Sequence, residues 1–267
     1  MSKYTKQENE KIKRQRLGKE MLNNQGCLMK IIEYNKASDI VIKFQDKYGY
    51  VVRTTYSNYK KGNVKNLYCP DIYGVAMIGA KYPSKINGSQ VKEYNAWFHM
   101  IRRCFDEKYN NAHKTYNNVS CCEEWLLYDN FYEWLHKQGN FEKWYDGERW
   151  NLDKDILTKG NKLYSPDTCC LVPQNVNTLF EKKENQRGKY PIGVTKTKTG
   201  YCAQCSNPYN KSIRWIGVYS TPEYAFNAYK EYKENLIKQV AQIEYDKGNI
   251  TKQCYEAMIN YKVEITD

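Results

Sequence analysis

The chain has 267 residues, of which 41% are hydrophobic and 27% are charged. This length and composition predict two or three modest domains that can bury hydrophobic cores. No run of 18 apolar residues occurs, which excludes a membrane-spanning segment. The net charge of +12 favours a polyanionic partner, most often nucleic acid, over the alternative of a merely basic surface.

The ten cysteines are expected to be reduced thiols, because the N-terminus is polar and carries no signal peptide. We expect a cytoplasmic protein, in the bacterial host cytoplasm if the chain is phage-encoded. The cysteines lack the usual zinc spacing, with the exception of Cys202 and Cys205. Those two fall in an alternating strand, where residues three apart face opposite ways, so no structural zinc is expected.

Residues 1–20 form a charged and predominantly basic arm with few apolar side chains. We interpret this arm as a loose helix or as disordered chain. A basic arm can add contacts to phosphate groups, and a solvated tail is the alternative.

Residues 21–84 change character, with strand-like alternation in MLNNQGCLMKIIEY, DIVIKFQ and YVVRTTY. NYKKGNVKNL and YGVAMIG continue the series, and short strands at regular spacing predict a small, strongly bent β-barrel. The pattern resembles a Src-homology-three-like barrel that recurs in phage DNA-associated proteins. This resemblance implies DNA contact or partner docking, with a purely structural role as the alternative.

The central region, residues 88–186, begins with two amphipathic helices. Apolar and aromatic side chains recur at helical spacing over residues 91–107 and again over roughly 123–137. We interpret these aromatic residues as core. His113 lies between the two helices in a polar loop, and loops often carry functional residues.

The second half of the central region reads as strand, glycine turn, strand and helix. Residues 150–157 alternate, and Gly160 with Asn161 supplies a tight reversal. Residues 168–172 form a second apolar strand, and Pro173 opens a helix. The order predicts a compact ββα unit.

This ββα unit resembles the ββα-metal core of phage-type HNH endonucleases, on the motifs LDKDIL, GNK, YSPDTC and VPQNVNTLF. The upstream motifs WFHMIRRCF and CEEWLLYDNFYEWL resemble the helical lead-in of the same family. The resemblance implies one Mg²⁺ or Mn²⁺ ion held by Asp153 and Asn177, and a hairpin fixed by Asn161. The family's water-activating histidine is replaced here by Lys154.

This replacement leaves the activity open. Lys154 can stabilise a phosphate, but lysine is a poor base because it is protonated near neutral pH unless strongly desolvated. Asp155 is expected on the opposite face of the strand, so it cannot simply substitute. Three interpretations remain: a weak or substrate-assisted nuclease, a nuclease that recruits His113 or another base, and a nuclease fold kept only for binding.

A linker at residues 181–189 leads to the last predicted domain, residues 187–267. Alternation in GYCAQCS and RWIGVY predicts three short strands, and Thr221 with Pro222 predicts the start of a long helix. The motifs GV, GY.A and WIGVYSTPEYAFNAY resemble the ethylene-response-factor (APETALA-type) DNA-binding domain. That family places a three-stranded sheet in the major groove with the helix packed behind it. Residues 246–267 are read as a structural tail that packs on this helix.

Alternation assigns Tyr201, Ala203 and Cys205 to the face that meets the helix. The opposite face is expected to meet DNA. The candidate DNA contacts, beside Cys202, are Gln204, Ser206, Lys196, Lys198, Arg214 and Trp215. These strands carry less arginine than is usual in the family, so phosphate contact is the safer expectation than base reading.

The sequence therefore predicts an α+β, multidomain protein that binds double-stranded DNA. The first hypothesis is a metal-dependent, homing-like HNH endonuclease that nicks or cleaves duplex DNA. The alternative is a non-catalytic DNA-binding protein on a degenerate nuclease fold, and an RNA partner or a protein-interaction role covers the remainder. No small-molecule substrate is evident.

Overall fold

The structure, a computed structural model, describes residues 5–147, 149–181, 189–209 and 212–267. The chain forms two compact units, the first built from Met1–Asn117 and Glu123–Glu133, the second from Asn118–Cys122 and Trp134–Asp267. Both units contain helices and strands, so the predicted α+β class is confirmed at this coarse level. Within the described part of the chain, no helix combines the length and the apolar character that crossing a bilayer requires.

The first unit opens with helix α1 (Lys6–Arg16), the helical alternative for the basic arm. A capping box fixes its start, because Thr5 and Glu8 satisfy each other's backbone N–H groups. At its end, the Arg16 guanidinium lies 3.8 Å from the centroid of the Tyr56 ring and donates to the Tyr34 hydroxyl at 2.6 Å. These contacts hold α1 against the sheet that follows.

An antiparallel sheet follows α1, and its strand order equals the chain order. Its strands are β1 (Glu20–Leu22), β2 (Leu28–Lys36), β3 (Asp39–Phe44) and β4 (Val51–Thr54). Met29 and Ile31 on β2 and Ile40, Ile42 and Phe44 on β3 are fully buried. The alternation seen in the sequence thus places one face of the sheet on the core.

The prediction of a β-barrel is wrong, since this sheet is open and no described pairing joins β1 to β4. The chain after β4 forms the short helix α2 (Tyr56–Lys60) and then turns. Gly62, Gly74 and Gly79 all have positive φ, which ends extended structure in the segments predicted as strands. Without those additional strands, the four-stranded sheet cannot close into a barrel.

The remainder of the first unit is mainly helical. Its elements are β5 (Lys85–Ile86), β6 (Ser89–Gln90), α3 (Lys92–Phe105), α4 (Glu107–Ala112), η1 (Lys114–Tyr116) and η2 (Glu123–Leu126). Helix α5 (Tyr128–His136) runs across the boundary between the units. Trp97 and Trp125 are fully buried, and Trp97 Nε1 donates to the Trp125 carbonyl at 2.7 Å. The predicted aromatic core of the two helices is confirmed.

The second unit begins with small elements around the predicted ββα order. These are β7 (Ser120–Cys121), α6 (Phe141–Asp146), β8 (Trp150–Asp153), β9 (Leu163–Tyr164), β10 (Cys170–Pro173) and α7 (Gln174–Phe180). Strand β8 pairs antiparallel with β10, and β7 pairs parallel with β9. Strand, loop, strand and helix therefore follow one another as predicted, although the first strand ends at Asp153 instead of residue 157.

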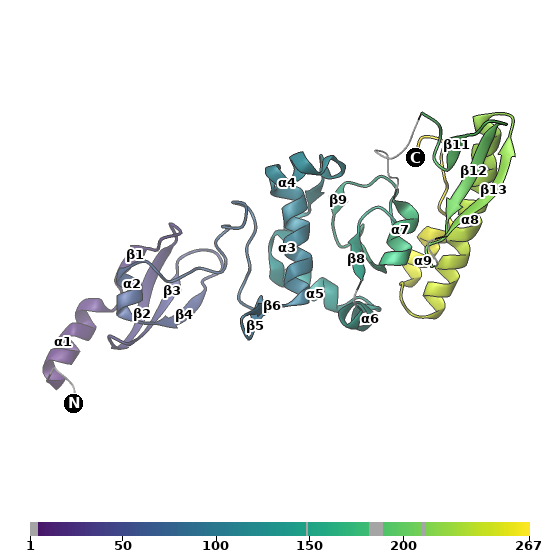
Figure 1. Ribbon diagram of the computed structural model, residues 1–267. Coiled ribbons are helices and arrows are strands. Elements are labelled where there is room, and N and C mark those ends of the chain that lie inside the picture. Colours follow the sequence, from purple (N-terminus) through teal and green to yellow (C-terminus); the bar gives the residue numbers. More distant parts are fainter. Residues whose placement is uncertain (1–4, 148, 182–188, 210–211) are drawn as a thin grey trace. The chain divides into compact units, whose positions relative to one another are not determined.

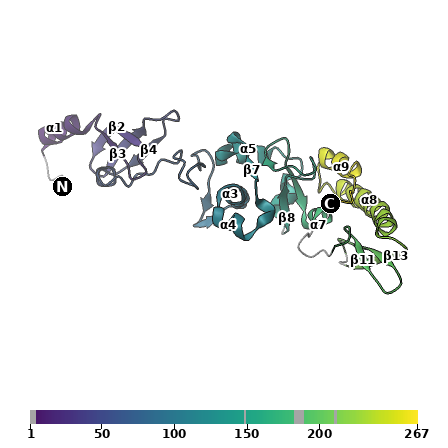
Figure 2. The same cartoon turned by 90° about the horizontal axis from the view of Figure 1, so that it is seen from above.

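The second half of this unit is a three-stranded antiparallel sheet with a long helix on one face, as predicted for residues 190–240. Its elements are β11 (Val194–Lys196), β12 (Tyr201–Ser206), β13 (Ile213–Tyr219), α8 (Pro222–Asp246) and α9 (Lys252–Ile259). Thr221 caps α8 by accepting the Tyr224 N–H at 3.3 Å, and Pro222 occupies the first turn. Helices α8 and α9 lie side by side in both views (Figure 1, Figure 2).

One hydrophobic core runs through the second unit. It joins Ile156, Val172 and Val176 of the ββα part to Val194 and Ala203 of the sheet, and it continues along α8 and α9. The predicted domain boundary at residues 186 and 187 and most of the predicted linker lie outside the described residues. The four-part domain division stays a prediction, but the core does not divide at that point.

Candidate nucleic-acid interface and ββα site

The sheet formed by β11, β12 and β13 has a covered face and an open face. Residues directly opposite one another on neighbouring strands point to the same face. Ala203 is opposite both Val194 and Gly217, and Val194 and Ala203 belong to the core packed against α8. This row marks the covered face.

The adjacent rows mark the open face. They are Thr195 with Cys202 and Val218, Gln204 with Trp215, and Ser206 with Ile213. Cys202 itself is only 5% exposed, so it is not available for the predicted DNA contact. Trp215 is 60% exposed, Ile213 64% and Val218 40%. The register agrees with the predicted orientation of Gln204 and Ser206. A set of exposed large apolar side chains on one sheet face is typical of an interaction surface.

The predicted cationic contacts do not lie in the rows of the open face. Lys196 is opposite Tyr201, in a row of the covered face, and its Nζ lies 3.9 Å from the centroid of the Tyr201 ring. Arg214 is opposite the core residue Cys205, on the outer strand β13. Lys198 lies in the exposed turn between β11 and β12. Lys196 and Arg214 thus lie in rows of the covered face, although both residues are exposed, and contact of the three cations with DNA stays a prediction.

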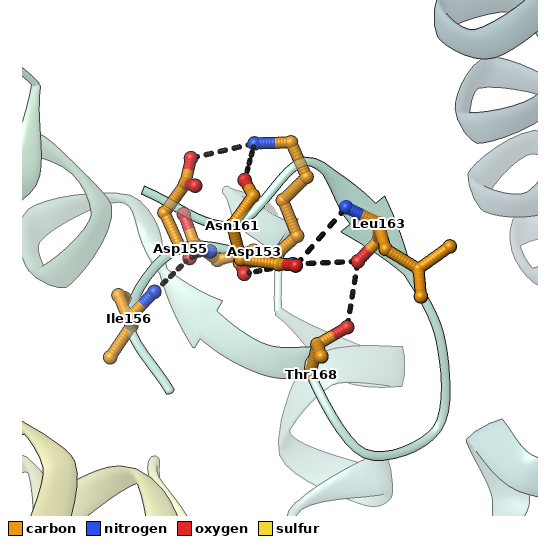
Figure 3. A network of polar contacts seen from close by, with 7 residues as sticks. Asp153, Asp155, Ile156, Asn161, Leu163 and Thr168 are labelled. Atoms are coloured by element: carbon orange, nitrogen blue, oxygen red, sulfur yellow. Dashed lines mark hydrogen bonds and ion pairs between the residues drawn. The ribbon is translucent and has the colours of Figure 1, made fainter. Parts of the chain in front are cut away.

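Asp153 ends strand β8 and organises the turn that follows. Its Oδ1 accepts hydrogen bonds from the backbone N–H groups of Asp155 and Ile156, at 2.7 and 2.8 Å (Figure 3). Burial raises the pKa of Asp153, and the two N–H donors offset this only in part. The strand stops here because the carboxylate holds the next residues in a turn.

The side chain of Asn161 fixes the end of the loop between β8 and β9 that lies next to β9. Its Nδ2 donates to the carbonyls of Lys154 and Leu163 at 2.9 and 2.7 Å, and its Oδ1 accepts the Leu163 N–H at 3.2 Å (Figure 3). Thr168 Oγ1 also donates to the Leu163 carbonyl, at 2.7 Å. These contacts close the loop as the resemblance assigns to this asparagine.

Lys154 and Asp155 meet, so the expectation that they face opposite ways is wrong. Lys154 Nζ donates to Asp155 Oδ2 at 2.7 Å and to the Asn161 carbonyl at 3.0 Å, with the lysine side chain only 8% exposed. The alternation rule fails because the strand already ends at Asp153 and the two residues belong to a turn. These contacts are structural, and a catalytic role of Lys154 stays a prediction.

His113 belongs to the first unit, where its ring packs against Tyr109 at a centroid separation of 4.3 Å. It follows α4 directly, at the start of η1. Its recruitment as a base stays a prediction.

The remaining oxygen donors of the ββα site suit Mg²⁺ or Mn²⁺ in kind. Asp153 Oδ2 accepts no hydrogen bond from the described residues, and the side chain of Asn177 on α7 makes none with them. Across the described ranges, no three His, Cys, Asp or Glu side chains gather to hold a metal ion. Asp153 and Asn177 would need water and phosphate oxygens to complete a ligand set, and metal binding here stays a prediction.

The C-terminal tail reaches this loop, a contact that no local sequence signal announces. Lys159 Nζ donates to the Lys262 carbonyl at 2.8 Å and to Asp267 Oδ2 at 2.9 Å. The same ammonium lies 5.1 Å from the centroid of the Tyr261 ring. Burial, together with Asp267, Asp155, Glu264 and Asp153, raises the pKa of Tyr261. The tail therefore packs on the ββα loop as well as on the helices.

Comparisons with known proteins find two partial relatives of this chain. No family model matches the chain, and no solved structure matches it at a significant level. The ethylene-responsive transcription factor ERF116 of Arabidopsis thaliana is 31% identical over 77 residues, which are 27% of this chain and 27% of that protein. ERF117 of the same plant is 26% identical over 117 residues, 39% of this chain and 35% of that protein. The chain thus spans about a quarter to a third of these relatives, which carry the family name that the motif at residues 190–240 resembles.

Proposed function

We propose that this protein binds duplex DNA through the open face of its β11–β12–β13 sheet. The observation that carries the proposal is this solvent-exposed face, on which Trp215 and Ile213 of the outer strand β13 are exposed, with the exposed cation Lys198 in the adjoining turn. A sheet can enter a DNA groove, as in other β-sheet readers. Two relatives are named as transcription factors, which supports a nucleic-acid partner.

The charge of the chain supports the same partner. A net charge of +12 attracts phosphate, and each neutralised phosphate releases counterions. Gln204 and Ser206 on the open face carry hydrogen-bonding groups that could meet base edges or phosphates. Phosphate contact positions such a protein, and base contact would specify its site.

The salt dependence of binding and the variant Trp215→Ala test the proposal together. We expect the affinity for a duplex oligonucleotide to fall more than about tenfold between roughly 50 and 200 mM salt, because counterion release drives binding. We expect Trp215→Ala to weaken binding by about tenfold, since tryptophan is enriched among the few interface residues that carry most of the binding energy. Fluorescence anisotropy with labelled duplex measures both.

Tyr224→Ala is the matched control. Tyr224 is 61% exposed, against 60% for Trp215, and it lies on α8 next to the buried Ala225 and Phe226 but faces solvent. Its removal should change affinity less than about twofold, as expected for surface positions outside an interface. Equal losses in the two variants, or binding that is insensitive to salt, would contradict the proposal.

A second candidate function is metal-dependent nicking of the bound DNA. It is favoured by one observation: the order β8, Asn161-fixed loop, β10 and α7, with Asp153 at the strand end. Asp153 Oδ2 and Asn177 would hold Mg²⁺ or Mn²⁺, which would supply positive charge to the scissile phosphate. The hydrogen bonds of Asp153 Oδ1 and of the Asn161 side chain would hold the loop in the conformation that presents the metal ligands.

Asp153→Asn separates the metal role from the turn-forming role. An asparagine Oδ1 can accept the same two backbone N–H groups, so the turn should persist while the anionic ligand is lost. We expect plasmid nicking with Mg²⁺ or Mn²⁺ to fall to background, with duplex affinity unchanged or slightly raised.

Asp167→Asn is the control for that experiment, because Asp167 is an exposed carboxylate in the same hairpin. It should leave nicking unchanged. Wild-type protein that binds duplex but never nicks with any divalent metal would favour the binding-only alternative.

A further inference from the structure

A cavity of about 650 Å³ lies in the second unit, beside the end of strand β12. Its walls come from α7, from residues 204–208 at the end of β12 and beyond, and from the middle of α8. Small-molecule sites typically have volumes of about 300–1,000 Å³. The cavity is therefore much larger than one inorganic phosphate needs and has room for a nucleotide.

Two cations line the cavity, and neither makes an ion pair with a described residue. Lys233 of α8 is partly buried, and within the described ranges its ammonium has neither an ion pair nor a hydrogen bond. Burial lowers the pKa of Lys233, and the nearby Cys205 thiol opposes this only in part. Arg149, at the exposed end of the same cavity, also has no side-chain partner among residues that the structure describes. A cation removed from water without a partner is costly, and a bound anion would remove that cost.

Neutral hydrogen-bonding groups complete the lining. Gln204 and Ser206 also line the cavity, although the strand register directs their side chains to the open face of the sheet. Asn175 donates its Nδ2 to Glu244 at 3.0 Å and keeps its Oδ1 for another donor. Glu181 is the acidic side chain among the described lining residues, and it is exposed and makes no ion pair with either cation.

We propose that this cavity binds the phosphate of a nucleotide, with Lys233 and Arg149 on the phosphate and the Asn175 amide oxygen on the nucleoside. Lysine and arginine are the side chains that recognise phosphate groups in proteins. The nucleotide is either free or part of a nucleic-acid strand, since both present the same group. The inference does not require the open face of the sheet to bind DNA.

Titration calorimetry on the full chain tests the site with deoxyadenosine 5′-monophosphate. Deoxyadenosine without phosphate should bind at least about tenfold more weakly, because charge-assisted hydrogen bonds carry the interaction. Lys233→Met should reduce affinity for the monophosphate by at least about tenfold as well. It should also raise the melting temperature of the unliganded protein, because it removes a desolvated cation. A lysine with only a structural role would show the opposite change in melting temperature.

Lys238→Met is the control, because Lys238 is an exposed lysine on the same helix. It should change neither affinity nor melting temperature. Arg149→Met, at the exposed end, gives a second test should Lys233→Met fold poorly, and it too should weaken binding. Prior addition of duplex DNA distinguishes the sources: competition indicates a strand phosphate, and simultaneous binding indicates a free nucleotide. Absence of phosphate-dependent binding in the wild type, or unchanged affinity in Lys233→Met and Arg149→Met, would overturn the proposal.

Discussion

Glu244→Ala is expected to lower the free energy of unfolding by at least about 3 kcal/mol, because three donors lose their acceptor and each buried donor left unsatisfied costs about 1–3 kcal/mol. Glu244 is 2% exposed on α8. Its carboxylate accepts hydrogen bonds from Asn249 Nδ2 at 2.7 Å, Tyr209 OH at 2.9 Å and Asn175 Nδ2 at 3.0 Å. These donors come from the loop after α8, from the β12–β13 connection and from α7. Alanine would leave all three without their acceptor, and chemical denaturation of the two proteins measures the difference.

The matched control is Glu256→Ala on α9. Glu256 is 55% exposed and lies 3.7 Å from Lys252, one turn away. An exposed pair of this kind contributes at most about 1 kcal/mol. If the two variants lose similar stability, Glu244 does not organise the second unit as its contacts indicate.

The contribution of Glu244 should also depend on pH. Burial favours the neutral acid, but hydrogen bonds from Asn249, Tyr209 and Asn175 outweigh it and lower the pKa of Glu244 below its usual value. A folded-state pKa below the unfolded one adds stability above the unfolded pKa of about 4.3, and this stability is lost as pH falls through the folded pKa. The stability difference between wild type and Glu244→Ala should therefore shrink only below about pH 4.3. A difference that grew on acidification would contradict this assignment.

Gly193→Ala is expected to lower the free energy of unfolding by about 2–5 kcal/mol, the sum of a positive-φ cost of ~1–2 and an overpacking cost of ~1–3. Gly193 precedes β11 with φ of +75°, and a Cβ there would lie 2.1 Å from the nearest Tyr229 ring atom. Tyr229 is 4% exposed and packed in the core, so its ring cannot move aside cheaply. Thermal and denaturant unfolding measure the loss.

Gly160→Ala isolates the steric part of that effect. Gly160 has the same φ of +75°, but nothing lies within 4 Å of the position that its Cβ would take. It should therefore show only the backbone cost of about 1–2 kcal/mol. Equal losses in the two variants would mean that Tyr229 yields readily, and the close contact would then not constrain the sheet against α8.

Local signals in the sequence determined much of the second unit. Thr221 and Pro222 locate the start of α8, because a side-chain cap and a fixed φ act within one turn. Alternation in β12 places Ala203 and Cys205 on α8, since successive strand residues face opposite ways. Gly160 with Asn161 predicted the turn and Pro173 the start of α7, whereas the loop-fixing role of Asn161 came from the resemblance to HNH endonucleases.

Only the tertiary structure decided how the N-terminal sheet ends and how the loop after β8 is arranged, because both features depend on contacts that local sequence patterns do not specify. The β-barrel did not form, since positive-φ glycines turned the chain where further strands were expected. Asp153 turned the backbone and brought Lys154 onto Asp155, which overrode the alternation of the strand. The Lys159 ammonium donates a hydrogen bond to the carboxylate of Asp267, which lies 108 residues later in the chain. Propensity and periodicity act over a few residues. Burial and strand pairing between distant residues determine which of the locally favoured conformations forms in the folded protein.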